Sequence, residues 1–125
     1  MTTQEVANQL VDLCRTGEWA QVQQDLYHQD CESVEPEGTP WGNVKGMEAI
    51  HQKGQQWASS IEEFHGIEVS DPLVAGDFFS VRMQTDTTFK GMGRTKFEEL
   101  CMYQVKDGKI VKEQFFYTPM PEPQT

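Results

Sequence analysis

Basic residues are scarce in this sequence, which has ten Lys and Arg against twenty Asp and Glu and a formal net charge of -10. Such a surface repels phosphate backbones and anionic lipids, so we expect no nucleic-acid partner and no membrane partner. No apolar run approaches the roughly 20 residues that a membrane span needs. The opening segment MTTQEVANQL also lacks the basic and apolar regions of a signal peptide. We therefore expect a cytoplasmic protein.

Closely spaced cysteine pairs are also missing. Cys14, Cys31 and Cys101 are an odd number of cysteines and form no CxxC motif, which argues against a disulfide framework and a structural zinc site. We interpret them as small buried apolar residues. The sequence contains no HExxH motif and no tight carboxylate loop, so a metal site is not expected.

The chain of 125 residues has the length of one typical domain, and its 37% hydrophobic content is enough for one core. We expect a single domain over residues 1–118. The segment 119–125, which is rich in Pro and Gln, is expected to form a flexible C-terminal tail.

Helical periodicity dominates the first sixty residues. It predicts helices over residues 3–15, 18–27 and 46–60. Lys53 is expected on the solvent side of the third helix, and Gly54 leaves space for either a close sheet contact or a ligand. The buried stripe of this helix is expected to contain Met47, Ile50, Gly54, Trp57 and Ile61.

After residue 62 the period changes to two, which is typical of strands. The glycines of KGMGR join two strands rather than preceding a helix, so this segment is interpreted as a hairpin loop and not as a phosphate site. Asp107 and Gly108 fit either a two-residue turn or a three-residue loop, residues 106–108. We expect the three-residue loop, because the two-residue turn would mix charged and apolar side chains on both faces.

The expected register pairs Cys101 with Glu113 and Glu99 with Phe115, and on the preceding hairpin it pairs Met83 with Cys101. His65 is expected on the inner side of the strand before that hairpin. The third helix covers the inner face through Ile50 and Trp57. That concave face is predicted to contain Phe79, Val81, Met83, Thr85, Cys101, Tyr103, Phe115 and Tyr117.

This order of segments, with the closing hairpin FEELCMYQVKDGKIVKEQFFY, resembles the SnoaL-like and ketosteroid isomerase-like proteins of the nuclear transport factor 2-like superfamily. The resemblance spans about residues 3–118 and implies one SnoaL-like domain. Its fold class is α+β: a cone-shaped, curved antiparallel sheet wraps around three N-terminal helices, in a cystatin-like arrangement with an internal pocket. It also implies an apolar small-molecule ligand, no cofactor and a homodimer through the outer sheet face. That face is expected to carry an apolar strip of Leu100, Met102, Ile110 and Phe116.

The catalytic residues of ketosteroid isomerases do not carry over to this chain. The position of their proton-moving carboxylate falls on Pro36, between Glu35 and Glu37. Their oxyanion-binding acid and tyrosine fall near Cys101 and Leu13, neither of which donates a strong hydrogen bond. Steroid isomerisation is therefore not expected.

Two carboxylates are predicted to share the inner face. Glu99 and Glu113 would be diagonal neighbours, roughly 7 to 8 Å apart at the backbone. Because two like charges in an apolar enclosure cannot both stay ionised cheaply, one pKa should rise and supply a proton donor beside an acceptor. Glu35, Glu37 and His65 are reserves near the rim, with His65 named as a third catalytic candidate. Alternatively, hydrogen bonds neutralise each glutamate in a buried network without chemistry.

The expected substrate-binding side chains are mainly apolar, as in other small-molecule sites. They are Trp57, Phe79, Val81, Met83, Cys101, Tyr103, Phe115 and Tyr117, with Trp41 as a further candidate. Two functions remain open. The protein is either an isomerase, cyclase or dehydratase that acts on a carbonyl compound, or a binding module without catalysis.

Overall fold

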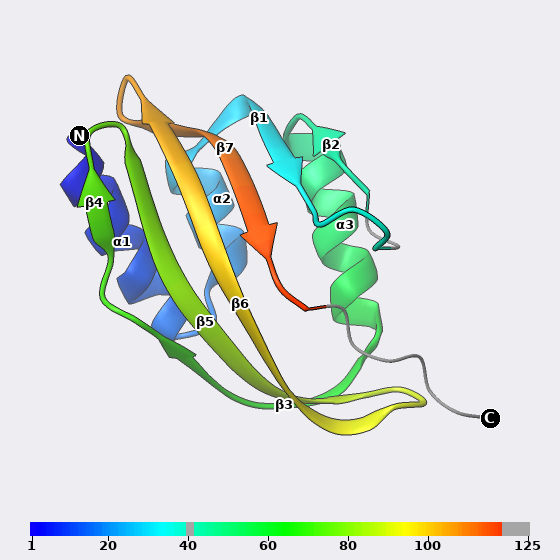
Figure 1. Ribbon diagram of the computed structural model, residues 1–125. Coiled ribbons are helices and arrows are strands. Elements are labelled where there is room, and N and C mark those ends of the chain that lie inside the picture. The colour runs from blue at the N-terminus through cyan, green and yellow to red at the C-terminus, as the bar shows by residue number, and fades with distance from the viewer. Residues whose placement is uncertain (40–41, 119–125) are drawn as a thin grey trace.

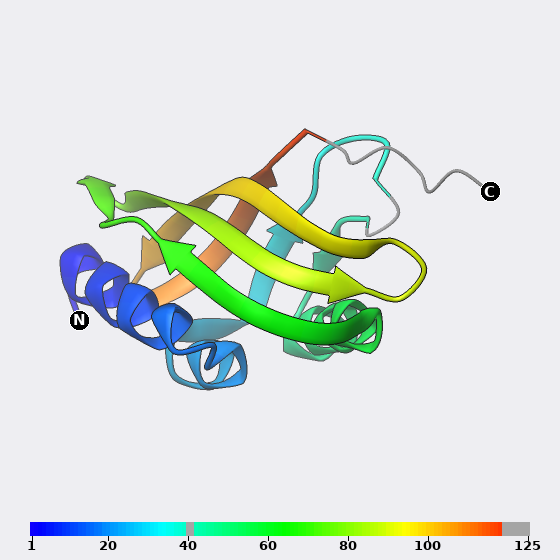
Figure 2. The same cartoon turned by 90° about the horizontal axis from the view of Figure 1, so that it is seen from below.

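The protein folds as a curved sheet with three helices on one face (Figures 1 and 2). The computed structural model describes residues 1–39 and 42–118. The tail at 119–125 and Trp41 lie outside the described residues. The order of the elements is α1 (Thr3–Arg15), α2 (Trp19–Leu26), β1 (Tyr27–Val34), β2 (Val44–Lys45), α3 (Met47–Ser59), β3 (Ile61–Val69), β4 (Leu73–Ala75), β5 (Phe78–Phe89), β6 (Gly93–Lys106) and β7 (Lys109–Phe116). The predicted α+β class and the three helices are confirmed.

The sheet is mixed, which corrects the expectation of a purely antiparallel one. In the described part of the chain it has seven strands in the order β2-β1-β7-β6-β5-β3, with β4 also paired to β5. Strands β1 and β7 run parallel, whereas the other pairs are antiparallel. Parallel neighbours need a long connection, and here the connection is most of the chain. The parallel pair places Ser33 beside Glu113.

Helix α1 closes one half of the inner face. Thr2 caps it through a reciprocal pair of hydrogen bonds with Glu5, which satisfies two backbone donors at its start. Its apolar stripe then packs into the main core with residues of β5 and β6, Phe79, Val81 and Tyr103 among them. The side chains that α1 buries are Val6, Ala7, Leu10, Val11 and Cys14.

The turn between β6 and β7 is the two-residue form, so the expected three-residue loop is wrong. Lys106 pairs with Lys109, and both Asp107 (φ 52) and Gly108 (φ 77) have positive φ, as a type I′ turn requires. The register shifts between Gln104 and Val105, so β7 holds one extra residue at Val111. This bulge offsets the shorter turn and returns Glu113 and Phe115 to the inner face.

The inner face nevertheless has the predicted orientation. Cys101 is 0% exposed and Met102 is 39% exposed, which confirms the alternation along β6. Pairing differs from the prediction by two residues, because Val81 faces Cys101 and Met83 faces Glu99. A shift of two positions keeps every side chain on its face, since the side-chain period of a strand is also two.

Helix α3 covers the other half of the inner face less completely than α1 covers the first. Ile50 is its one buried residue, and Trp57 is half-buried. Gly54 is exposed, with no atom near the position of a Cβ, so neither use proposed for it is observed. No helix among the described residues has both the length and the apolar character to cross a membrane.

Candidate functional site

Polar side chains meet between α3 and the inner side of β1, β6 and β7. This buried polar cluster consists of Tyr27, Ser33, Glu35, Lys53, Glu99, Glu113 and Tyr117. Sequence analysis named both Glu99 and Glu113 but placed Lys53 in solvent. The cluster contains three carboxyl groups and one cation, so its properties depend on how the carboxyl groups are neutralised.

Glu113 is held by fixed donors. Its side chain is almost fully buried at 5% exposure. The hydroxyl of Tyr27 donates to Oε1, and Ser33 Oγ donates to Oε2 at 2.6 Å. Burial raises the pKa of Glu113, while the hydrogen bonds from Ser33 and Tyr27 lower it. Both carboxyl oxygens therefore have partners within the protein.

Lys53 links this carboxyl group to a second one. Its Nζ donates to Ser33 Oγ and, at 3.0 Å, to Glu35 Oε1. The side chains of this ion pair are 11% and 9% exposed, so water screens them little. Lys53 Nζ also lies 5.6 Å from the centre of the Phe115 ring. The predicted solvent position of Lys53 is wrong because this part of α3 covers polar rather than apolar residues.

Glu35 is a central member of the cluster rather than a reserve at its rim. Its Oε2 accepts a hydrogen bond of 2.9 Å from the Tyr117 hydroxyl, while Oε1 binds Lys53. Burial, followed by the charge of Glu35, raises the pKa of Tyr117, so the phenol keeps its proton and acts as a donor. Glu37 is exposed and makes no contact described in the cluster.

Glu99 differs from both other carboxyl groups. Burial and then the charge of Glu35 raise its pKa to about 7, while the thiol of Cys101, a weak donor, and the charge of Lys53 lower it. Desolvation penalises the ionised form, and among residues 1–39 and 42–118 no strong fixed donor compensates it. Glu99 is therefore the carboxyl group that changes protonation near neutral pH.

The predicted diagonal pairing of the two glutamates is wrong. Glu113 faces Tyr103 of β6, and Glu99 lies four residues before Tyr103 on the same strand, where it faces Met83. At about 3.3 Å per residue, this separates their backbone positions by roughly 13 Å along the strand. Glu35 therefore affects the pKa of Glu99 more than Glu113 does. The two-residue turn and the bulge at Val111 together shift the register of β7 by two residues and account for the difference.

His65 does not join the cluster. The register of β3 shifts between Phe64 and Gly66, and His65 lies in this bulge as an exposed side chain. Its Nε2 is 2.7 Å from the hydroxyl of Thr88, on the outer face of β5. The bulge reverses the direction that strict alternation predicted.

The side chains expected to bind a substrate divide into two groups. Phe79, Val81, Cys101 and Tyr103 are buried in the core under α1, where Phe79 stacks on Tyr103 at 4.8 Å. Phe115 and Tyr117 are half-buried beside the polar cluster, where they contact Lys53 and Glu35. Trp57 is half-buried against Trp19 and Phe89, and Met83 belongs to the main core. Phe97 joins the second group through an edge contact with Tyr117 at 4.9 Å.

The hollows described on the protein lie away from the cluster. One, of about 540 Å³, lies at the N-terminus of α3 and includes Lys45, Gly46 and Met47. Another, of about 370 Å³, lies beside Thr2 and the turn at Asp107. Neither is lined by residues of the buried polar cluster. Within residues 1–39 and 42–118, no group of three His, Cys, Asp or Glu is arranged to hold a metal ion.

Three residues of the cluster, Tyr27, Ser33 and Lys53, were not expected at the site from the sequence. Tyr27 and Ser33 lie at the ends of the segment YHQDCESV, which becomes the parallel neighbour of β7. Alternation in this segment places Ser33 on the same face as Cys31 and could have indicated its burial. Nothing in the local sequence indicates that Lys53, a residue of α3, binds Glu35.

Helices on one face of an open, curved sheet are the fold of solved structures described as cystatin-like and nuclear transport factor 2-like. The SnoaL-like domain family matches residues 1–117. The chain therefore belongs to the SnoaL-like family. No functionally curated protein matches it.

Solved structures give the same result. A candidate SnoaL-like polyketide cyclase from Mesorhizobium loti is 36% identical, with a TM-score of 0.88 over 94% of this chain and 100% of that chain. TerC, crystallised with polyporic acid, is 16% identical, with a TM-score of 0.76 over 93% and 91% of the two chains. A ketosteroid isomerase-like protein from Catenulispora acidiphila in complex with trimethylamine is 17% identical, with a TM-score of 0.73 over 94% and 88%. The last two likenesses establish the fold alone.

Proposed function

We propose that the protein is an acid–base enzyme that acts on a small, apolar carbonyl compound, with Glu99 as the group that moves the proton. The observation that carries this proposal is the half-buried Glu99 carboxyl group, whose pKa of about 7 gives it both protonation states near neutral pH. A general acid or base is most effective when its pKa lies near the working pH. Glu113 is less suited to this role, because Tyr27 and Ser33 occupy its two oxygens.

In the proposed reaction, ionised Glu99 removes a proton from the carbon next to the substrate carbonyl. The electron pair of that bond moves toward the carbonyl oxygen and forms an enolate. Lys53 donates a hydrogen bond to this oxygen, because its ammonium group has a third N–H beyond those bound to Ser33 and Glu35. Protonated Glu99 then returns the proton to another atom of the substrate, as an isomerase or cyclase requires.

Glu113 has a positioning role in this scheme. It holds the hydroxyl of Ser33, and Ser33 accepts from Lys53, so the chain of contacts fixes the ammonium group. Glu35 balances the Lys53 charge through an ion pair of 3.0 Å. Fixed donors of this kind stabilise a developing negative charge without reorganising during the reaction.

The surroundings favour a neutral, apolar substrate. Phe97 and Phe115 border the cluster as half-buried aromatic side chains, Phe115 beside Lys53 and Phe97 against Tyr117. Three carboxyl groups against one lysine would repel an anion. The Mesorhizobium loti relative, described as a candidate polyketide cyclase, and TerC with polyporic acid are consistent with aromatic or polyketide-like ligands. Glu99 is half-buried, and a displacement of α3, in which Ile50 is the one buried residue, would widen the access to it.

Proton exchange tests the proposal. The probe is 2-tetralone, whose protons next to the carbonyl exchange with deuterium, and NMR follows their loss in deuterated buffer. We expect wild-type protein to accelerate the exchange and Glu99→Gln to reduce this acceleration about 100-fold or more. Glu98→Gln is the matched control, because Glu98 lies on the outer face and pairs with Arg82. An unchanged rate in Glu99→Gln would exclude Glu99 as the proton carrier.

A binding module without catalysis is the second candidate. It is favoured by the fully paired Glu113 and by the absence of cluster residues from the described hollows. In this case calorimetry would detect binding of 2-tetralone, but wild-type protein would not accelerate its exchange. The same two measurements therefore separate the two functions.

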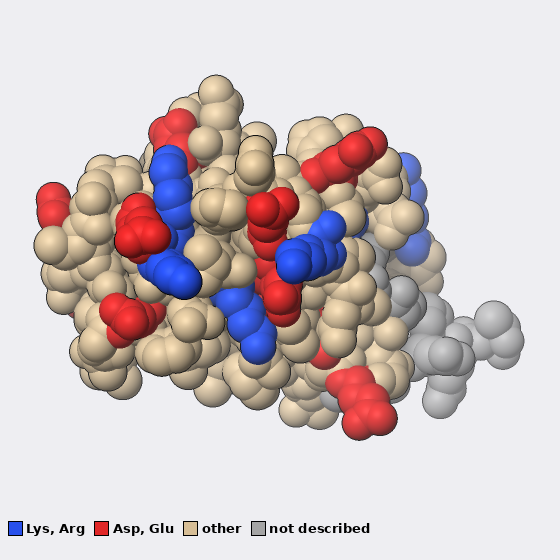
Figure 3. Space-filling model, turned by 90° about the horizontal axis from the view of Figure 1, so that it is seen from above, with Lys and Arg blue, Asp and Glu red and all other residues tan. Residues whose placement is uncertain are grey.

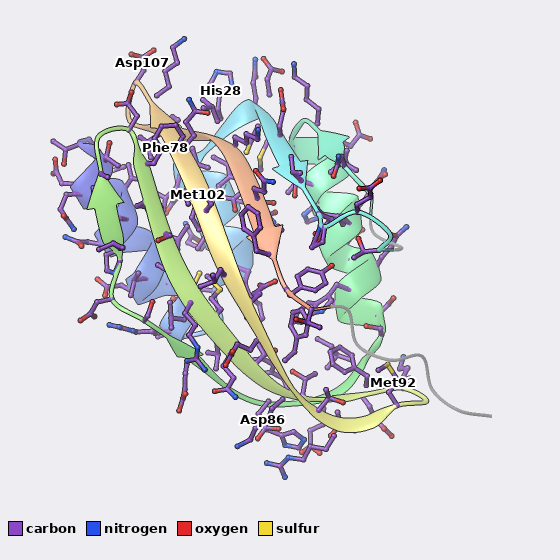
Figure 4. The ribbon with its side chains drawn as sticks, in the orientation of Figure 1. His28, Phe78, Asp86, Met92, Met102 and Asp107 are labelled. Carbon is purple, nitrogen blue, oxygen red and sulfur yellow. The ribbon has the colours of Figure 1, made fainter. Side chains whose placement is uncertain are left out.

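A homodimer through the outer sheet face is also proposed. Leu100, Met102 and Phe116 are 55%, 39% and 48% exposed, and Leu100 and Phe116 are paired neighbours. Figure 4 shows Phe78 and Met102 on the same sheet. Ile110, expected in this strip, is 0% exposed and belongs to the core, because the turn and bulge rotate it inward.

A second copy is a suitable partner for this strip. Exposed apolar side chains are costly in water, and the Arg82–Glu98 pair beside them offers both signs of charge to an identical surface. Figure 3 likewise shows basic and acidic side chains intermixed on the face that it presents. Sedimentation should give a dimer for wild-type protein and a monomer for Leu100→Glu. A monomeric wild-type protein at micromolar concentration would exclude this assembly.

A further inference from the structure

Two buried hydroxyl groups on β5 have no hydrogen-bond partner among the described residues. They belong to Thr85, which is 8% exposed, and Thr87, which is 0% exposed. Both lie on the inner face of the strand, two positions apart. Buried polar atoms normally have a partner, because an unpaired hydroxyl in an apolar environment costs free energy.

Their neighbours in the sheet are apolar except for Thr95, and Thr95 donates to the Gly93 carbonyl rather than to Thr87. Thr85 lies between Ile67 and Phe97, while Thr87 lies between Phe64 and Thr95. Valine has almost the same shape as threonine and would pack here without an unpaired oxygen. The hydroxyl groups therefore point to a polar partner that is present when the protein works.

Aromatic side chains surround this part of the inner face. Trp57 of α3 contacts Phe89 at 6.4 Å and Trp19 at 5.5 Å between ring centres, and Trp19 contacts Phe64 at 5.3 Å. Phe64 pairs with Thr87 across the strands, and Phe89 is two residues from it. Trp57 belongs to α3, the helix with one buried residue, whose displacement would widen the access to Glu99.

We propose that Thr85 and Thr87 form a second polar subsite, which binds a hydroxyl or carbonyl oxygen at the far end of the ligand. This inference rests on the proposed function and adds a substrate class to it. Glu99 faces Met83, so Thr85 is its diagonal neighbour, roughly 7 to 8 Å away at the backbone. A ligand about two fused rings long would bring a reacting carbonyl to Glu99 and a second oxygen to the threonines. The substrate is therefore an oxygenated, two-ring or larger aromatic ketone.

Matched ketones test the subsite. The probes are 6-hydroxy-2-acetonaphthone and 2-acetonaphthone, which differ by the one hydroxyl group at the far end. We expect wild-type protein to bind the hydroxylated ketone about tenfold or more tightly in calorimetry, because the analogue leaves the threonines unpaired. In Thr85→Val/Thr87→Val the ratio of the two dissociation constants should fall close to one. Thr88→Val, on the outer face beside His65, is the matched control and should retain the preference.

The melting temperature provides a second measurement on the same variants. Removal of two unpaired hydroxyl groups should raise it in the absence of ligand. A lower melting temperature with an unchanged preference would show that ordered water satisfies the threonines, and it would overturn the subsite. Equal binding of both ketones by wild-type protein, or binding of neither, would also overturn it. Glu99→Gln should abolish proton exchange but keep the preference for the hydroxylated ketone, so failure of the subsite and failure of the proposed function are distinguishable.

Discussion

The two halves of the inner sheet face are built differently. Under α1 the face is apolar and closed, and five of the helix residues are buried. Under α3 the face contains an ion pair, three carboxyl groups and half-buried aromatic rings, and Ile50 alone is buried from the helix. A small domain needs a tightly packed core to fold, whereas a ligand site needs polar groups and access. The comparison therefore assigns stability mainly to the α1 half and chemistry to the α3 half.

The largest effect on stability should come from the α1 half. Leu10→Ala removes a side chain that is 0% exposed and leaves a cavity, so we expect the free energy of unfolding to fall by about 3 kcal/mol. Met47→Ala in α3, at a partly buried position, should cost about 1 kcal/mol or less. Urea unfolding of the two variants gives both values. Equal losses of unfolding free energy in the two variants would contradict the idea that the α1 half contributes more to stability than the α3 half.

A smaller effect, which depends on pH, should come from Glu99. Its pKa is about 7 in the folded protein against 4.5 as the ordinary value, so folding favours the protonated form. That contribution is fully present below about pH 4.5 and is lost as the pH rises to about 7. Glu99→Gln keeps a neutral side chain, so it should match wild-type stability at pH 4.5 and exceed it by about 2 kcal/mol at pH 8.

Thermal unfolding of wild-type protein and Glu99→Gln at both pH values measures this difference. Glu98→Gln, on the exposed outer face, should show no such gain at pH 8. A Glu99→Gln protein that is less stable than wild type at pH 8 would mean that Glu99 is ionised and stabilised by its surroundings. In that case the α3 half would be a structural network.

The smallest effect compares two tyrosines of the buried polar cluster. Tyr27→Phe removes a donor from fully enclosed Glu113, so we expect a loss of about 1.5 kcal/mol at pH 7 and a further rise in the pKa of Glu113. Tyr117→Phe removes a donor from Glu35 at a half-buried position and should cost less than about 1 kcal/mol. Urea unfolding and carboxyl NMR provide the measurements. A larger loss of unfolding free energy in Tyr117→Phe than in Tyr27→Phe would contradict the expectation that the more buried hydrogen bond contributes more to stability.

The orientation of the sheet was predictable from alternation alone. Cys101 and Met102 lie on the predicted faces because alternation along β6 does not depend on the turn that follows it. Glu113 and Phe115 of β7 also keep the predicted face, because the two-residue turn and the bulge at Val111 cancel in their effect on β7. Their combined effect on register was not predictable, since a bulge has no strong local sequence signal. Ile110, which lies between the turn and the bulge, was therefore placed on the wrong face.

The site was predictable only in part. Glu99 and Glu113 were recognisable as inward carboxylates, whereas Lys53 was assigned to solvent by the rule that charged residues of an amphipathic helix face water. That rule fails here because Glu35, eighteen residues earlier, lies where α3 packs. His65 was misplaced because a bulge in β3 turns it outward.

The sequence by itself determined the three helices, the period of the strands, the inner face of the sheet and the family resemblance. These features depend on local periodicity and on the order of segments, which the chain carries directly. Only the tertiary structure decided that β1 lies parallel to β7, that Ser33 and Tyr27 hold Glu113, and that Glu99 has a pKa of about 7. The physical reason is that the pKa of a carboxyl group depends on its burial and on charges within a few ångströms, and residues distant in sequence supply both.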